Sequence, residues 1–195
     1  MNIVRRTGWL LIVGFFFILV GALVAPQEAY IGELSERLDV IRQQNTRWLW
    51  SKVFDAFGAA LPGIAFAMLS WKIADRQSRP GMARFAGWLM AFSAILAIYY
   101  VYLLTTDPGR LWVNGFPEPL SFLFIIAYLV AFLLLLFSIS ERITPPWVFY
   151  LSAPVAVLAL LVAVVFREQS PFYLFAILSA LNAVIGIPML RSDYS

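Results

Sequence analysis

Long apolar runs alternate with polar connectors along the whole chain. Six runs are long enough to form membrane-crossing helices, at about 8–25, 53–71, 85–104, 119–139, 147–166 and 172–190. Crossing about 30 Å of hydrocarbon takes about 20 mostly apolar residues. The connectors after the third run are short, so successive helices are expected to pack as antiparallel neighbours. The pattern predicts an all-α fold in which six transmembrane helices form one membrane domain over residues 1–195.

The connector between the first two runs, residues 27–50, is a polar segment with a helical pattern. Charged residues fall between apolar positions that recur at helical spacing, namely Ile31, Leu34, Leu38, Ile41 and Trp48. This spacing predicts an amphipathic helix on the outer side of the membrane. Trp48 and Trp50 suit the boundary between water and lipid. The helix is expected either to cap the bundle or to bind a membrane-protein partner.

Composition places most of the chain in lipid. Hydrophobic residues make up 62% of the sequence and charged residues 13%, against about half and about a quarter in soluble domains. The net charge is +3, but the basic residues lie in connectors rather than in one patch, so no nucleic-acid partner is expected. The lipid bilayer is the expected surrounding.

Histidine and cysteine are both absent from the sequence. Disulfides, thiolate nucleophiles, zinc fingers, iron–sulfur clusters and Ser-His-acid triads are therefore excluded. A metal site would be restricted to carboxylate and carbonyl ligands, which suit hard cations. No cofactor and no metal site are predicted.

The distribution of basic residues predicts the orientation. Eight lie on the side of the chain termini and six on the other side; the first group is Arg5, Arg6, Lys72, Arg76, Arg79, Arg84, Arg142 and Arg191. Lys and Arg favour the cytoplasmic side. Both termini are therefore expected in the cytoplasm, with the bundle in a bacterial cytoplasmic membrane. The first run is expected to be retained rather than cleaved, because it is long and Pro26 follows Ala25.

Asp55 is a candidate ion or ligand site, because ionisable residues inside membranes are costly. It lies within one turn of the predicted outer boundary, three residues after Lys52, so a local ion pair is the alternative. Asp55, Ala59, Gly63 and Ala67 are spaced by four and form a stripe that lets another helix approach closely. The carboxylate is therefore expected to point into the bundle.

Three further residues complete the candidate polar site. An outer vestibule would place Glu118 or Tyr99 opposite Asp55. Asn182 lies at depth in the sixth run, where it either joins helices by a hydrogen bond or contacts a ligand.

Pro62 and Gly63 lie in the middle of the second run. This pair is interpreted either as a helix break of the kind that transporters use or as a packing feature.

The first half of the chain resembles known membrane proteins in its arrangement. A first apolar run is followed by the outer segment YIGELSERLDVIRQQNTRWLW, a second run rich in small residues and a basic turn. This order is similar to that of small bacterial multi-pass membrane protein families of unassigned function. The resemblance implies a multi-pass membrane protein and transfers no site residues.

Three functions are compatible with these observations. The first is a non-enzymatic accessory subunit, or ligand- or lipid-binding subunit, with its exposed helix on the outer side. The second is a small transporter or channel for an ion or small solute that uses Asp55 and a helix break at Pro62. The third is an intramembrane enzyme that acts on lipids, which the lack of His, Cys and paired acids in the runs disfavours.

Overall fold

The computed structural model describes residues 2–31, 33–76, 79–108, 119–139, 143–165 and 170–191. Within these ranges all regular structure is helical, as predicted. The α-helices are α1 (Ile3–Val24), α2 (Leu34–Gln43), α3 (Asn45–Ile73), α4 (Pro80–Thr106), α5 (Pro119–Ile139), α6 (Pro146–Val165) and α7 (Ser170–Leu190). Two short 3-10 helices, η1 (Gln27–Tyr30) and η2 (Ala74–Arg76), precede α2 and α4.

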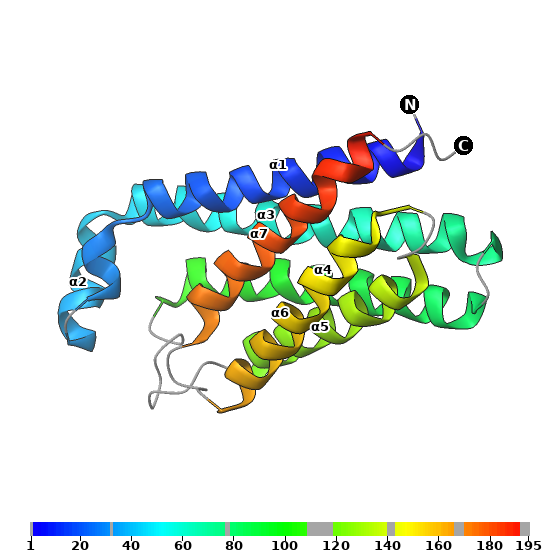
Figure 1. Ribbon diagram of the computed structural model, residues 1–195. Helices are drawn as coiled ribbons and strands as arrows, with labels where there is room; N and C mark the ends of the chain where they lie inside the picture. Colours follow the sequence, from blue (N-terminus) through cyan, green and yellow to red (C-terminus); the bar gives the residue numbers. More distant parts are fainter. Residues whose placement is uncertain are drawn as a thin grey trace.

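The long helices form a ring in which the chain reverses direction at each connection (Figure 1). Each of α1, α3, α4, α5 and α6 contacts the next long helix along the chain, and α7 returns to contact α1. The contact between α1 and α7 is close, since a Cβ atom built on Gly8 would lie 2.8 Å from the carbonyl oxygen of Gly186. Glycine at both positions therefore lets α7 pack closely against α1, and this contact completes the ring of helices.

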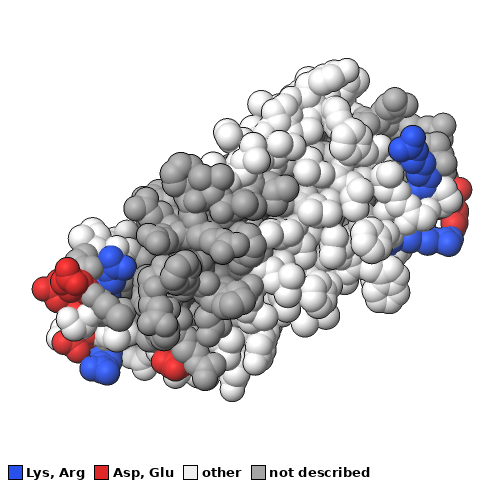
Figure 2. Space-filling model, turned by 90° about the horizontal axis from the view of Figure 1, so that it is seen from below, with Lys and Arg blue, Asp and Glu red and all other residues white. Residues whose placement is uncertain are grey.

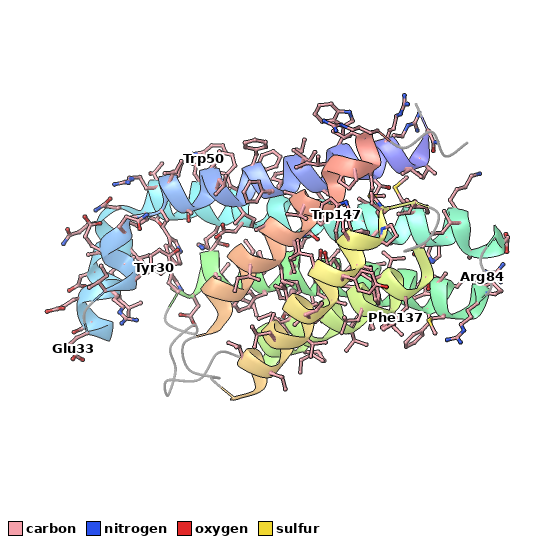
Figure 3. All side chains as sticks on the ribbon, viewed as in Figure 1. Tyr30, Glu33, Trp50, Arg84, Phe137 and Trp147 are labelled. Carbon is pink, nitrogen blue, oxygen red and sulfur yellow. The ribbon has the colours of Figure 1, made fainter. Side chains whose placement is uncertain are left out.

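The two ends of the bundle differ. At one end, which we call the cap end, lie η1, α2, the start of α3 and the last turn of α4, which is joined to α3 by a hydrogen bond from Trp48 to Leu104. At the other, which we call the basic end, lie the first turn of α1, the η2 turn between α3 and α4, and the last turn of α7 (Figure 1). Glu33, which precedes α2, and Arg84 on α4 mark these ends in Figure 3.

Three helices are long and apolar enough to cross a membrane, namely α1, α3 and α4. In α5, α6 and α7 the described apolar stretches are shorter, at Leu123–Ser138, Pro146–Ala159 and Ile177–Leu190. They fall short of the about 20 residues that a crossing usually needs. By length and composition, the described residues thus contain three helices able to cross a membrane, where the sequence pattern predicts six.

The surface between the two ends is apolar. On the face drawn in Figure 2, the Lys, Arg, Asp and Glu side chains gather at the two ends of the molecule, and the described surface between them is uncharged. Large exposed side chains, among them Phe16, Phe57 and Ile95, line the middle of the long helices. On α3 the exposed Trp50 and Trp71 lie about 31 Å apart along the axis at about 1.5 Å per residue. That distance matches the hydrocarbon thickness of a bilayer.

The segment predicted as one amphipathic helix over residues 27–50 is instead divided into three parts. It comprises η1, α2 and the start of α3, which begins eight residues before the predicted run at residue 53. Gln44 ends α2 and also precedes the first residue of α3, so the chain turns sharply there. A capping box between Glu33 and Glu36 fixes the start of α2. This division into three helices determines which residues of the segment contact the rest of the bundle.

Candidate functional site at the cap end

Three residues of α3 present their side chains on one face near the cap end. Trp48, Lys52 and Asp55 are spaced by four and three residues, which places them one above the other on a helix. Because α3 extends before the predicted run, this face reaches the turn that contains Tyr30. The face therefore meets η1 rather than open water.

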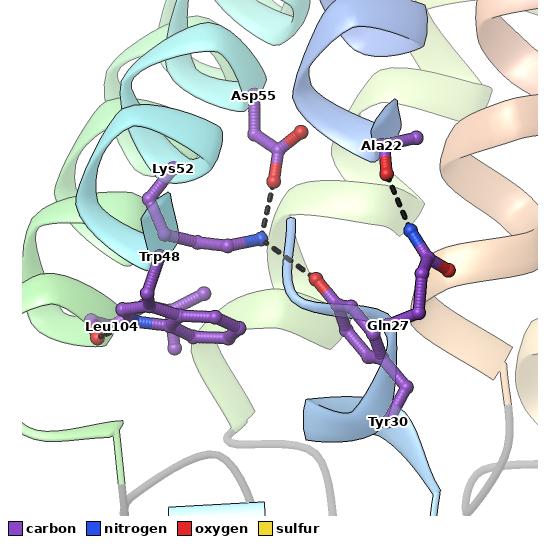
Figure 4. Close-up of polar contacts among 7 residues, drawn as sticks. All are labelled: Ala22, Gln27, Tyr30, Trp48, Lys52, Asp55 and Leu104. Carbon is purple, nitrogen blue, oxygen red and sulfur yellow. Dashed lines mark hydrogen bonds and ion pairs between the residues drawn. The ribbon is translucent and has the colours of Figure 1, made fainter. Parts of the chain in front are cut away.

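Lys52 lies at the centre of this group (Figure 4). Its side chain is only 7% exposed and pairs with Oδ2 of Asp55. Nζ also donates a hydrogen bond of 3.4 Å to the hydroxyl of Tyr30. The indole ring of Trp48 lies beneath it, 4.7 Å from Nζ to the ring centroid. A carboxylate, a hydroxyl and an aromatic face thus surround the ammonium, which is how a buried cation offsets the loss of water. We call Tyr30, Trp48, Lys52 and Asp55 the Lys52 cluster.

Trp48 connects the cluster to other parts of the cap end. It is 1% exposed and forms a small apolar core with Ala29 and Ile41. Its Nε1 donates a hydrogen bond of 3.3 Å to the carbonyl oxygen of Leu104. That carbonyl lies in the last turn of α4, where helices leave acceptors unsatisfied. Trp48 is therefore in contact with neither water nor lipid, because η1 and α2 pack over it, whereas Trp50 is exposed. The predicted depth of both rings at a water–lipid boundary stays a prediction.

Asp55 faces α1. Its side chain is 24% exposed, and a Cβ atom built on Gly21 would lie 2.5 Å from Oδ1. The end of α1 is held nearby by Gln27, whose Nε2 donates a hydrogen bond of 2.7 Å to the carbonyl oxygen of Ala22 (Figure 4). Glycine at position 21 therefore makes room for the carboxylate between two helices.

The small-residue stripe that begins at Asp55 serves two neighbouring helices. Ala59 and Ala67 are buried in the core. Gly63 lies against α4, since a Cβ atom built on it would be 2.9 Å from Cβ of Ala94. Asp55 by contrast lies against α1. The stripe winds around α3 because spacing by four exceeds the 3.6 residues of a helical turn.

Pro62 lies inside α3, which continues through it to Ile73. Its ring packs against α1, where a Cβ atom built on Gly14 would lie 2.8 Å from Cγ and Cδ of Pro62. In this structure Pro62 and Gly63 are therefore contact points with α1 and α4, respectively.

Asn182 takes part in a separate polar contact in the bundle interior. The hydroxyl of Tyr128 on α5 donates a hydrogen bond of 2.8 Å to its Oδ1. Asn182 is 3% exposed, so this bond joins α5 to α7 within the core. Tyr128 also stacks on Phe132, which meets Phe66 of α3 edge to face.

Tyr99 does not join the Lys52 cluster. It is 51% exposed on α4 and stacks on the exposed ring of Tyr102 at 6.5 Å between centroids. Glu118, the other expected neighbour of Asp55, lies outside the described residues. The structure thus brings Asp55 together with Lys52, Trp48 and Tyr30.

A groove of about 500 Å³ follows the outward face of α6 beside Pro154. Its lining is almost entirely apolar, with Phe149, Tyr150, Val157 and Leu158 among the residues. Among the residues that the structure describes, no group of three His, Cys, Asp or Glu side chains could hold a metal ion. The charged chemistry of the described interior is therefore concentrated in the Lys52 cluster.

Comparisons with known proteins add no assignment. No protein-family model, curated protein or solved structure matches the chain. The resemblance to small bacterial multi-pass families stays a prediction.

Proposed function

We propose that the protein is a multi-pass membrane protein in which all six long helices cross the bilayer. Support comes from the ring arrangement, in which α5, α6 and α7 lie beside the three helices that are long and apolar enough to cross. These three have 21, 20 and 21 residues, close to the length of a crossing. The basic end is assigned to the cytoplasmic side of a bacterial cytoplasmic membrane, because Lys and Arg favour that side.

The proposed role is that of a non-enzymatic accessory subunit, which binds a membrane-protein partner through α2 on the outer side. The observation that carries this proposal is the way α2 is held. One side of α2 packs through Ile41 on Trp48, which in turn lies under the buried ammonium of Lys52. The other side exposes Ser35, Asp39 and Arg42. A helix fixed in place loses little entropy when a partner binds its exposed side.

The packing of the interior also favours a binding role over transport. Phe132 on α5 contacts both Phe66 of α3 and Tyr128 of α5. The amide oxygen of Asn182 already accepts a hydrogen bond from Tyr128. Large packed side chains and a satisfied amide oxygen at this depth suit a structural core rather than a path for ions.

The proposal is tested by placing a photo-activated cross-linking residue at Ser35 or Gln43, both exposed on α2. Irradiation of native membranes is expected to yield one discrete cross-linked membrane protein at both positions. A matched probe at Ile95, exposed on the apolar surface of α4, is expected to yield lipid adducts alone. The accessory role is wrong if α2 gives the same lipid adducts or no adduct.

A small transporter or channel is the second candidate, favoured by one observation. Asp55 is 24% exposed while its partner Lys52 is 7% exposed, so the carboxylate is the part of the pair that a cation from outside would meet first. This role predicts a proton- or sodium-dependent flux in reconstituted vesicles that Asp55→Asn abolishes. Flux equal to that of protein-free vesicles would eliminate it and leave the accessory role standing.

A further inference from the structure

Charge is distributed unequally between the two ends of the bundle. Among the side chains that the structure describes, the basic end carries six basic and one acidic residue, a net charge of +5. These are Arg5, Arg6, Lys72, Arg79, Arg84 and Arg191, with Asp75. The cap end carries four basic and six acidic residues, a net charge of −2. These are Arg37, Arg42, Arg47 and Lys52, with Glu28, Glu33, Glu36, Asp39, Asp55 and Asp107. An anionic partner would therefore be attracted to the basic end.

The corner between α3 and α4 combines this charge with exposed indole rings. Trp71 and Trp88 meet edge to face with ring centroids 5.2 Å apart. Both remain exposed, at 41% and 66%. Gly87 makes the contact possible, since a Cβ atom built there would lie 2.8 Å from Nε1 of Trp71. The two rings thus form a fixed aromatic surface on the side of the bundle.

Exposed basic residues lie next to Trp71 and Trp88 along the two helices. Lys72 follows Trp71, and Arg84 lies one turn before Trp88 on α4. Nη2 of Arg84 is 2.6 Å from Oδ1 of Asp75, but the two side chains are 59% and 76% exposed, so water and other anions can reach the guanidinium. Lys72 is exposed as well. We call Trp71, Lys72, Arg84 and Trp88 the basic corner.

We propose that the basic corner binds the head groups of anionic phospholipids. The phosphate and other anionic head-group oxygens lie against Lys72 and Arg84, and the indole rings lie at the level between head group and acyl chain. A lipid fits better than a free phosphate ion, because a free ion has no apolar part to contact Trp71 and Trp88. This inference rests on the membrane insertion proposed above but not on the accessory role.

The test measures which lipid surrounds the reconstituted protein. The vesicles contain phosphatidylcholine and a minor share of phosphatidylglycerol. In one preparation the acyl chains of phosphatidylcholine are brominated, and in the other those of phosphatidylglycerol. Bromine quenches tryptophan fluorescence on contact. The wild-type protein is expected to be quenched by brominated phosphatidylglycerol about threefold more strongly than its share of the bilayer accounts for. Lys72→Gln with Arg84→Gln is expected to reduce this preference to about one.

Two further variants make the result specific. Arg42→Gln with Arg47→Gln removes the same charge from the cap end and is expected to keep the preference. Asp75→Asn frees Arg84 from its acidic neighbour and is expected to increase the preference, in a protein that keeps every basic residue. The proposal is overturned if the Lys72 and Arg84 variant keeps the wild-type preference or if the cap-end variant loses as much.

Adding inorganic phosphate distinguishes binding of a lipid head group from binding of a free phosphate ion. Inorganic phosphate is added at the same ionic strength as a sodium chloride control. It is expected to reduce the preference for phosphatidylglycerol no more than sodium chloride does. A specific loss in phosphate would show that the corner binds the free ion, and the lipid proposal would be wrong. These outcomes do not depend on whether α2 has a partner.

Discussion

Nζ of Lys52 lies 4.7 Å from the centroid of the Trp48 ring, in a side chain that is only 7% exposed. The same ammonium pairs with Asp55 and donates a hydrogen bond to Tyr30. One buried charge therefore holds residues from η1 and from two successive turns of α3.

Lys52→Met is expected to destabilise the protein by about 2–4 kcal/mol, because it leaves a largely buried carboxylate without its cation. The measurement is the midpoint of thermal unfolding in detergent. The chain offers a matched control, since Arg42 and Asp39 form an ion pair with the same i,i+3 spacing on the exposed side of α2. Arg42→Met is expected to change stability by less than about 0.5 kcal/mol.

The double variant Lys52→Met with Asp55→Asn separates lost charge pairing from lost packing. It is expected to recover part of the stability lost in Lys52→Met, since no uncompensated charge remains. Equal losses in the single and double variants would show that the unpaired carboxylate carries no penalty of its own.

Gly21→Ala is expected to destabilise the bundle by about 1–3 kcal/mol, since the new methyl group would meet Oδ1 of Asp55 at 2.5 Å. Either α1 moves away from α3 or the carboxylate leaves Lys52. Gly81→Ala is the control, because nothing lies within 4 Å of a Cβ atom at that position. There the substitution should be neutral or stabilising by up to about 1 kcal/mol, since alanine favours helix. Equal effects at both sites would contradict close packing at Gly21.

Tyr128→Phe removes the donor to Asn182. The expected cost is about 0.6–1.7 kcal/mol, the range for hydrogen bonds between helices in membranes. Tyr102→Phe, at a ring that is exposed on α4, should leave the unfolding midpoint unchanged. If Tyr128→Phe also left the unfolding midpoint unchanged, the hydrogen bond between α5 and α7 would make no contribution to stability.

The proposed orientation is accessible to cysteine labelling, because the chain contains no cysteine. A membrane-impermeant maleimide is expected to label Gln43→Cys on intact cells with an exposed outer face. Gly81→Cys, at the basic end, should be labelled only after lysis. The reverse pattern would place the basic end outside and invalidate the orientation, while leaving the fold unaffected.

The sequence was informative where a local pattern determines the structure. Apolar runs located the long helices, and the spacing of Lys52 and Asp55 suggested their pairing, because residues three apart share a helix face. The burial of Lys52 could not be predicted, since it depends on Tyr30, which lies 22 residues earlier. Whether Tyr30 folds back is decided by the turn at Gln44 and by packing around Trp48. Contacts between residues so far apart along the chain produce no periodic pattern in a single sequence.

The expected neighbours of Asp55 show the same limit. Tyr99 was proposed from its place near the outer end of a run, but the rotation of α4 turns it to the surface. Proximity along the membrane normal says nothing about which side of a helix faces the bundle. The aligned contacts of Gly21 and Gly14 with α3, by contrast, specify how α1 and α3 meet.

The contact between Gly8 and Gly186 joins α1 to α7, two helices that lie far apart along the chain. While the chain is being made, α1 can pair with α3 early, but the side of α1 around Gly8 stays uncovered until α7 has been made. The contact between α1 and α7 therefore forms later than the contact between α1 and α3. A chain cut short before α7 should expose that narrow glycine-lined surface to cellular quality-control factors, however well its earlier helices have packed.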